Sequence, residues 1–235
     1  MNRSRFRGTA ASILIGSIFV AQGQTSGNKV PVSRRSLCVT EGTIGNGAEN
    51  RLAVDDPKVR AYVNTWTSQA VETHFTYLGK TTVELPLGSG EIRRQFGLKL
   101  LAQNACNLVY VMWRFEPESK IVVSVKRNPG QTTSAECGNR GYENIKAVRS
   151  DPVPLVRSGD SHDLDAILNG TELTVTVDGQ KVWVGDVGQG AADLSGPVGI
   201  RSDNARLDFN LWAVPSQNPH PHYARACRSS PEGSD

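Results

Sequence analysis

Residues 168–185 read LNGTELTVTVDGQKVWVG, and this stretch decides the fold. Asn169-Gly170 and Asp178-Gly179 are dipeptides that accept the positive φ angles of tight hairpin turns. The residues around them alternate between apolar and polar side chains, which is the period of a β-strand. The stretch therefore predicts three consecutive antiparallel strands, over residues 162–168, 172–177 and 180–185.

The same alternation predicts strands on both sides of this stretch. They cover residues 71–77, 92–100, 121–125, 197–202 and 205–213. Residues 107–115 (NLVYVMWRF) are apolar on both parities, which is typical of a central strand covered on both faces. The last two of these strands are expected to form a closing pair.

Two segments break the strand pattern. Asp55-Asp56-Pro57 predicts a short helix over residues 55–63, because an acidic cap precedes a proline at the first helical position. Residues 128–142 (NPGQTTSAECGNRGY) are polar and rich in glycine, and they predict a long loop. No long helix and no repeat is present. We therefore predict an all-β fold, a two-sheet antiparallel jelly-roll sandwich with at most one or two short helices.

The chain divides into four segments. Residues 1–23 resemble a secretory signal peptide, with Arg3, Arg5 and Arg7 before an apolar run over residues 10–21 that is shorter than the roughly 20 residues of a membrane span. A flexible lead-in is expected over 24–36, a single β-sandwich domain over 37–214, and a loose tail over 215–235 that Cys227 tethers. These features predict a secreted protein, extracellular or periplasmic, with no membrane span.

Charge and cysteine usage agree with export. Of 26 basic residues three lie in the signal segment, so the remaining 23 face 23 acidic residues, and no basic footprint for nucleic acid remains. Four cysteines in an oxidising compartment allow three pairings. We favour Cys106–Cys137, which would pin the 128–142 loop to the preceding strand. Cys38–Cys227 would then join the two ends of the mature chain.

Two passages carry a family resemblance. Residues 159–164 (GDSHDL), with the DG hairpin after them, and residues 196–209 (GPVGIRSDNARLDF) resemble patterns of the concanavalin A-like lectin/glucanase superfamily, in particular its laminin-G-like and 3-keto-disaccharide hydrolase-like members. The resemblance covers about a quarter of the chain, in its C-terminal half, and implies a jelly-roll sandwich. It also implies a structural role for His162 at the start of a core strand. Calcium on the rim, held by Asp203 or Asp208, is the one metal it suggests; no other cofactor is expected.

The residues argue against catalysis. Glucanases of this superfamily carry an E-x-D-x-x-E strand, which this sequence lacks. Asp163 and Asp165 share one face of a strand, but Leu168 stands at the third acidic position, and the alternation places both aspartates on a solvated face. Ser161-His162-Asp163 cannot act as a triad, because neighbours on a strand point to opposite faces.

The loop over residues 128–142 supplies the candidate ligand-binding residues. Sugar recognition needs an aromatic face beside polar groups that fix orientation. The set expected to provide them is Arg94, Trp113, Arg114, Glu136, Asn139, Arg140 and Tyr142.

Three functions remain open at this point. The preferred hypothesis is a secreted, non-catalytic, monomeric β-sandwich that binds polysaccharide, glycan or another cell-surface component. The alternative is a saccharide-active hydrolase or lyase that uses Arg94, His74, Glu136 and Tyr142. A purely structural envelope protein is the third.

Overall fold

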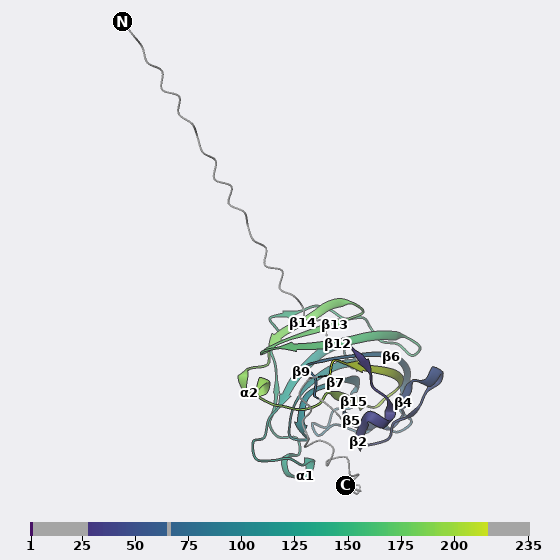
Figure 1. Ribbon diagram of the computed structural model, residues 1–235. Helices are drawn as coiled ribbons and strands as arrows, with labels where there is room; N and C mark the ends of the chain where they lie inside the picture. The colour runs from purple at the N-terminus through teal and green to yellow at the C-terminus, as the bar shows by residue number, and fades with distance from the viewer. Residues whose placement is uncertain (2–27, 65–66, 216–235) are drawn as a thin grey trace.

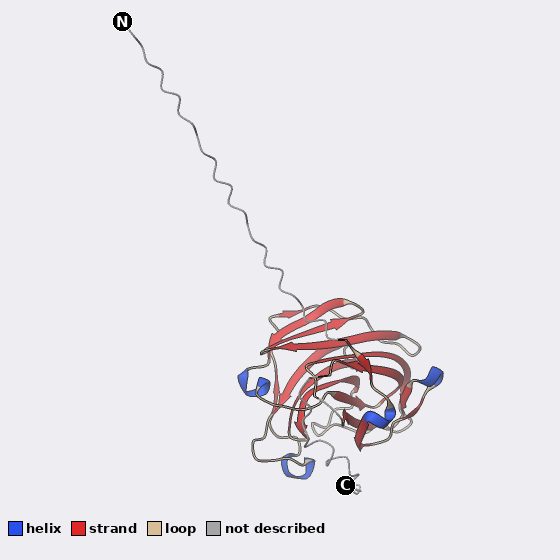
Figure 2. Cartoon of the chain, in the orientation of Figure 1, coloured by secondary structure: helices blue, strands red, loops and turns tan. Residues whose placement is uncertain are grey.

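Two antiparallel β-sheets pack face to face in the computed structural model, which describes residue 1 and residues 28–64 and 67–215. In Figure 1 the strands labelled β14, β13, β12 and β6 lie above those labelled β9, β7, β15, β5 and β2. Helices are confined to short pieces at the periphery (Figure 2). The all-β sandwich predicted from the strand alternation is confirmed.

The two sheets differ in size. The nine-stranded sheet holds, in spatial order, β11 (Arg149–Ser150), β14 (Gln180–Asp186), β13 (Glu172–Val177), β12 (Ser161–Asn169), β6 (Ala70–Lys80), β16 (Ala205–Ala213), β4 (Leu52–Val54) and β3 (Gly45–Asn46), with β1 (Val30–Pro31) also paired to β16. The seven-stranded sheet holds β10 (Tyr142–Asn144), β9 (Lys120–Lys126), β8 (Asn107–Glu116), β7 (Arg94–Asn104), β15 (Gly199–Asp203), β5 (Lys58–Val63) and β2 (Leu37–Glu41). The helical pieces are α1 (Ser134–Cys137), α2 (Gln189–Ala192) and the 3-10 turns Arg34–Ser36 and Ala48–Asn50.

The hairpins from β12 to β14 form as the turn dipeptides predict. Asn169 pairs with Glu172 across the first turn, and Val177 pairs with Gln180 across the second. Gly179 has a φ of 76°, a left-handed conformation that favours glycine. The central strand β8 is also confirmed, since its side chains are buried on both faces of the sheet along most of its length.

Aromatic side chains fill the space between the sheets. Trp113, Phe75, Phe96 and Phe209 are all fully buried. The Phe75 ring lies 5.7 Å from Trp113 and 5.3 Å from Phe96, both edge-on, and Phe96 lies 5.4 Å from Phe209. Such offset contacts are the preferred geometry of aromatic pairs and add to the large apolar area buried. One core therefore joins β6 and β16 of one sheet to β7 and β8 of the other.

The helix predicted over residues 55–63 is wrong, because residues 58–63 form strand β5. Val59, Ala61 and Val63 are fully buried, and the residues between them are partly exposed. This period of two places one apolar face against the core. The burial of three alternate side chains outweighed the helix-start signal at Asp55-Asp56-Pro57, since local capping contributes only about 1 kcal/mol.

The two strands predicted near the end of the domain exist, but they do not pair with each other. β15 belongs to the seven-stranded sheet and β16 to the nine-stranded one, and the chain crosses at Asn204 with a φ of 52°. The Asn204 amide nitrogen donates to the carbonyls of Leu85 (2.9 Å) and Arg93 (3.0 Å). These bonds hold the loop between β6 and β7 at the crossing point.

The expected lead-in over residues 24–36 also differs from the structure. Val30 and Pro31 pair with Ala213 and Trp212, and Arg34–Ser36 form a 3-10 turn. The ordered fold thus begins before residue 37. The expected signal segment over 1–23, apart from residue 1, and the tail from residue 216 with Cys227 lie outside the described residues.

Candidate functional site

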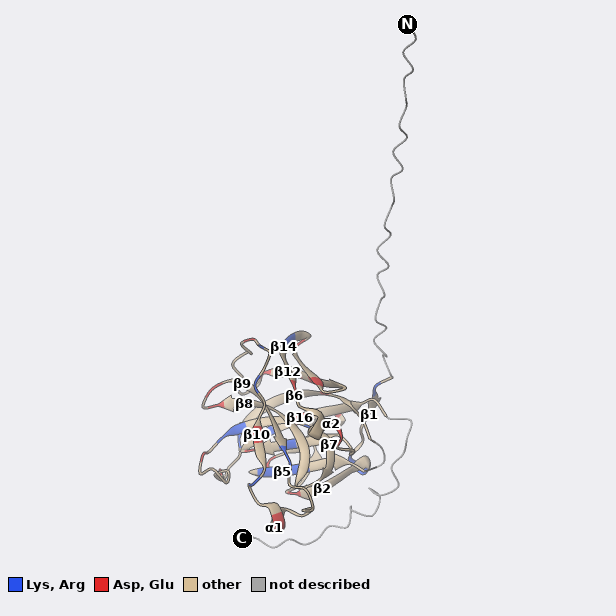
Figure 3. Ribbon diagram, turned by 90° about the vertical axis from the view of Figure 1, so that its left-hand side faces the viewer, with Lys and Arg blue, Asp and Glu red and all other residues tan. Residues whose placement is uncertain are grey.

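The outer face of the seven-stranded sheet, which points away from the core, carries a cluster of basic and aromatic side chains. Along each strand of this sheet, alternate residues face the core; Ile200, for example, lies between Ala61 and Leu98, and all three side chains are fully buried. The alternate, outward-facing positions carry a basic and aromatic set across six strands. Lys and Arg positions are blue in Figure 3. We call this set the cationic face: Arg60, Lys99, Tyr110, Lys126, Tyr142 and Arg201.

Two tyrosines form the aromatic part of the cationic face. The rings of Tyr110 and Tyr142 stack with their centroids 5.9 Å apart and an interplanar angle of 22°. The Arg201 guanidinium lies 5.0 Å from the Tyr110 ring centroid, and the Lys126 ammonium lies 5.1 Å from that of Tyr142. Tyr110 is 6% exposed and Tyr142 is 40% exposed. Tyr142 therefore presents the accessible aromatic edge of this face.

A buried carboxylate anchors the two arginines. Asp203 accepts hydrogen bonds from Arg60 (2.5 Å), from Arg201 Nε (2.8 Å) and from the Gln95 amide (2.7 Å). Burial acts to raise the pKa of Asp203, but the two guanidinium groups outweigh it and hold the pKa well below its usual range. Asp203 is fully buried and permanently charged at neutral pH, so it fixes both arginines in place.

Lys99 lies at the centre of the cationic face and lacks such a partner. In register it stands between Tyr110 of β8 and Gly199 of β15. Its side chain is buried, and within the described part of the chain its ammonium has no hydrogen-bond or ion-pair partner. Burial, followed by repulsion from Arg60 and Arg201, lowers the pKa of Lys99 well below its ordinary value.

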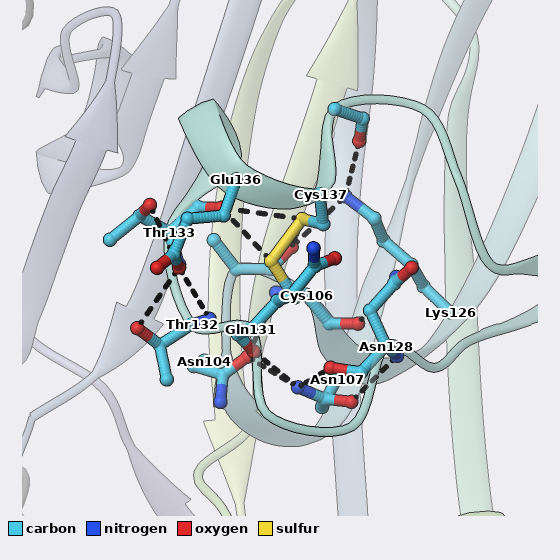
Figure 4. Close-up of a disulfide and its surroundings, with 12 residues drawn as sticks. Asn104, Cys106, Asn107, Lys126, Asn128, Gln131, Thr132, Thr133, Glu136 and Cys137 are labelled. Atoms are coloured by element: carbon cyan, nitrogen blue, oxygen red, sulfur yellow. Dashed lines mark hydrogen bonds between the residues drawn. A yellow bond between two sulfur atoms is a disulfide. The ribbon is translucent and has the colours of Figure 1, made fainter.

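A disulfide-braced loop approaches the face at the end where β9 finishes. Cys106 and Cys137 are bonded, one of the pairings the sequence suggested, and the bridge fixes α1 beside β8 (Figure 4). Lys126 Nζ donates to the carbonyls of Gly138 (2.8 Å) and Ala105 (3.2 Å). Because Lys126 belongs to the cationic face, these bonds place the residues after α1 over that face.

The loop between β6 and β7 approaches from the opposite end of the sheet. Its Glu91 carboxylate lies 3.6 Å from the Arg114 guanidinium. Arg114 is on the same face of the sheet as Lys126, but its register partner Lys120 is six residues from Lys126 along β9, a separation of about 20 Å. Gly88 of this loop contacts the α1 loop, since a Cβ on it would lie 1.7 Å from the amide nitrogen of Asn139. The two loops thus meet over the sheet, which agrees with the burial of Lys99 and Tyr110 beneath them.

Two of the seven residues expected to bind a ligand lie on this outer face. Tyr142 belongs to the cationic face, and Arg114 lies beyond its far end. The Nε atom of Arg114 is buried and has no hydrogen-bond partner among the described residues. Burial lowers the pKa of Arg114. Asn139 sits at the meeting point of the two loops.

Other members of the expected set have structural partners instead. Trp113 points into the core, fully buried, and donates to the Ser119 hydroxyl (3.1 Å). Arg94 is held by Glu84 (2.7 Å) and by Glu116. Arg140 donates to the Cys137 carbonyl, within its own loop. The structure therefore places Trp113 in the core and gives Arg94 and Arg140 internal partners, and it does not bring these three to the cationic face.

Glu136 forms the cap of α1. Its carboxylate accepts hydrogen bonds from the backbone amides of Thr132 and Thr133 (both 2.8 Å), the capping-box arrangement. The backbone amide of Thr132, then that of Thr133, lowers the pKa of Glu136 to about 2. The role of Glu136 is to begin the helix that carries Cys137.

The capping role gives a direct prediction for solution measurements. In a pH titration followed by NMR of the side-chain carboxyl carbon, Glu136 should titrate near pH 2, because protonation must break the capping hydrogen bonds. A midpoint for Glu136 near the ordinary glutamate value of about 4.3 would contradict the cap.

The catalytic set proposed for a hydrolase or lyase does not converge. His74 lies on the outer face of the nine-stranded sheet, where it contacts Asp163 (2.8 Å). Tyr142 lies on the outer face of the opposite sheet, and Arg94 and Glu136 are held by partners of their own. Asp163 is exposed on this face, as the alternation predicted. Asp165 lies on the same face but is partly buried, 3.5 Å from Lys29, and burial raises its pKa.

His162 and the suggested calcium ligands have structural surroundings. The His162 ring faces the core, 4.9 Å from Trp113, and contacts the Asp178 carboxylate (2.8 Å). Asp208 accepts from the Ala48 amide (3.0 Å), and Asp203 is bound to the two arginines. Within the described residues no group of three or more His, Cys, Asp or Glu side chains gathers to hold a metal.

The comparisons with known proteins show the fold. No protein-family model and no curated protein sequence matches the chain. Among solved structures, the carbohydrate-binding module CBM66 from Bacillus subtilis is similar, with a TM-score of 0.51 at 13% identity over 74% of this chain and 91% of that one. A Bacillus subtilis protein of unknown function with a galectin-like fold gives 0.49 at 13% identity over 77% and 89%. The carbohydrate recognition domain of Emp46p gives 0.46 at 11% over 75% and 88%.

The similarity to the CBM66 module agrees with the jelly-roll sandwich described above. At this level of identity the comparisons show the fold alone, so the function has to be argued from the side chains of the site.

No helix in residues 28–64 or 67–215 has the length and apolar character needed to cross a membrane.

Sequence reasoning missed Arg60, Lys99, Tyr110, Lys126 and Arg201. A feature that could have indicated part of this set is the strand over residues 107–115, which is apolar on both faces. Its outward side chains, such as Tyr110, require neighbours on the same face, and the polar parity of the adjacent strand supplies Lys99. Strand order in space was needed to join these positions to Arg201.

Proposed function

We propose that the protein is a secreted, non-catalytic, carbohydrate-binding β-sandwich whose ligand lies on the cationic face. The observation that carries the proposal is the stacked Tyr110–Tyr142 pair beside Arg201, with Tyr142 accessible. An aromatic ring offers the C–H face of a sugar a flat apolar surface, and a guanidinium fixed by Asp203 offers its hydroxyl groups directed donors. The fold shared with a carbohydrate-binding module supports the same proposal.

A binding role fits the carboxylates better than a hydrolytic one does. Glycoside hydrolysis needs a carboxylic acid that holds a proton near neutral pH, beside a second, ionised carboxylate. The buried carboxylate of this face, Asp203, is held ionised by Arg60 and Arg201. Glu41, on the edge strand β2, lies 3.7 Å from the Arg60 guanidinium and is about half exposed, so it too is paired with a cation.

Export and superfamily membership form part of the proposal. The N-terminal sequence pattern supports secretion, and the Cys106–Cys137 bridge suits an oxidising compartment. The sequence patterns around residues 159–164 and 196–209 support placement in the concanavalin A-like superfamily. We also propose the Cys38–Cys227 bridge. Peptide mapping without reductant would show it as one cross-linked pair, and a Cys38 peptide released without reduction would refute it.

Binding is tested by a glycan array with matched variants. Wild-type protein should bind a subset of saccharides, and Tyr142→Ala should weaken that binding about tenfold, because losing one stacking surface costs about 1.4 kcal/mol. Trp212→Ala is the control, since Trp212 lies on the outer face of the other sheet, opposite Glu72. Absence of binding across the array, or equal loss in both variants, would refute the proposal.

A further inference from the structure

The cationic face carries more positive than negative charge, and the imbalance lies at Lys99 and Lys126. Asp203 neutralises part of the charge of Arg60 and Arg201. Lys126 donates to two backbone carbonyls and has no carboxylate partner among the described residues. Lys99 has neither kind of partner there. Two largely buried lysines therefore share a face with two arginines, against one buried carboxylate, Asp203, and one half-exposed carboxylate, Glu41.

A largely buried lysine without a carboxylate paired to it is costly to the folded protein. A charge removed from water is normally compensated by an ion pair or by several hydrogen bonds. Lys99 is 6% exposed, and burial and two neighbouring guanidinium groups all disfavour its charged form. Groups kept in such surroundings occur most often at functional sites, where a ligand supplies the missing partner.

The surroundings of Lys99 indicate what that partner is. Tyr110 flanks Lys99 in register, and Tyr142 stacks on Tyr110 and reaches solvent. A sugar ring placed on the accessible tyrosine would direct its substituents toward the ammonium groups of Lys99 and Lys126. Resting on the proposed function, we infer that the cationic face recognises an acidic saccharide, one whose ring carries a carboxylate or a sulfate group.

Calorimetric titrations with matched sugars test this inference. The probes are trigalacturonic acid, its methyl ester, which has the same rings without charge, a sulfated trisaccharide, and inorganic sulfate. We expect at least one charged trisaccharide to bind ten or more times more tightly than the methyl ester, and the tighter of the two identifies the anionic group. Inorganic sulfate should bind far more weakly than either, because it cannot stack on Tyr142.

Variants show whether Lys99 is responsible. Lys99→Met keeps the chain length and removes the charge, and it should abolish the preference for the charged sugar while the melting temperature stays the same or rises. Lys181→Met, an exposed lysine on β14 of the other sheet, should change neither. A lower melting temperature for Lys99→Met would mean that the ammonium supports the fold, which contradicts the inference.

The outcomes separate the two proposals. Equal affinity for the methyl ester and for both charged trisaccharides would overturn the acidic-saccharide inference and leave saccharide binding intact. Inorganic sulfate binding as tightly as the charged trisaccharides would also overturn it. No binding of any trisaccharide, together with no signal on the glycan array, would overturn both.

Discussion

Asp203→Ala should lower the free energy of unfolding by about 3–5 kcal/mol, because it leaves two largely buried guanidinium groups without their shared counter-charge. Asp203 is fully buried, and the side chains of Arg60 and Arg201 are each 12% exposed. Urea denaturation at pH 7 measures the loss. Asp151→Ala is the matched control: the Asp151–Arg149 pair is exposed and screened by solvent, so its loss should change the free energy of unfolding far less.

The same residue predicts a pH dependence. The folded-state pKa of Asp203 is depressed, so its contribution to stability is fully present above its unfolded pKa of about 3.9 and is lost as the pH falls toward the lower folded value. Wild-type stability should therefore fall more steeply than that of Asp203→Asn between about pH 4 and pH 2. Parallel pH profiles for the two proteins would contradict the buried ion pair.

Replacing both Cys106 and Cys137 by serine should cost about 3–4 kcal/mol, the loop-closure free energy of a bridge between residues 31 positions apart. The bridge fixes the loop whose Gly138 carbonyl accepts from Lys126, so saccharide affinity should fall together with stability. Guanidinium denaturation and calorimetric titration measure the two effects. Wild-type protein treated with reductant should lose at least as much stability as the double variant, because reductant also opens the proposed Cys38–Cys227 bridge.

The result that would contradict this prediction is specific. Unchanged saccharide affinity in a folded double-serine variant would mean that the α1 loop has no part in the site. A thermal or chemical midpoint equal to that of the oxidised wild type would mean that the bridge does not restrict the unfolded chain.

Much of the fold could be predicted from local pattern alone. The Asp178-Gly179 turn fixed one hairpin, and the doubly apolar run over residues 107–115 identified a central strand. Both are properties of neighbouring residues, which alternation and turn chemistry describe well. The prediction of a helix over residues 55–63 was wrong because the capping residues Asp55 and Asp56 stabilise a helix less than burial of Val59 and Ala61 in the core stabilises the strand.

The binding face was harder to predict, because it joins residues that are distant in sequence. Arg60 and Arg201 lie in adjacent strands about 140 positions apart, and only the sheet order reveals that Asp203 binds both. The expected set had instead been chosen for residue type within one loop. Glu136 and Arg140 proved to satisfy hydrogen bonds of that loop, which sequence alone does not distinguish from ligand contacts.

An NMR titration of isotopically labelled protein with trigalacturonic acid tests the central claim most directly, since it locates the ligand. We predict that the largest amide shifts occur at Lys99, Tyr110, Tyr142 and Arg201, with Asp163 and Trp212 of the opposite sheet unmoved. Shifts confined to that opposite face, or no shift anywhere at millimolar sugar, would contradict the assignment of the site.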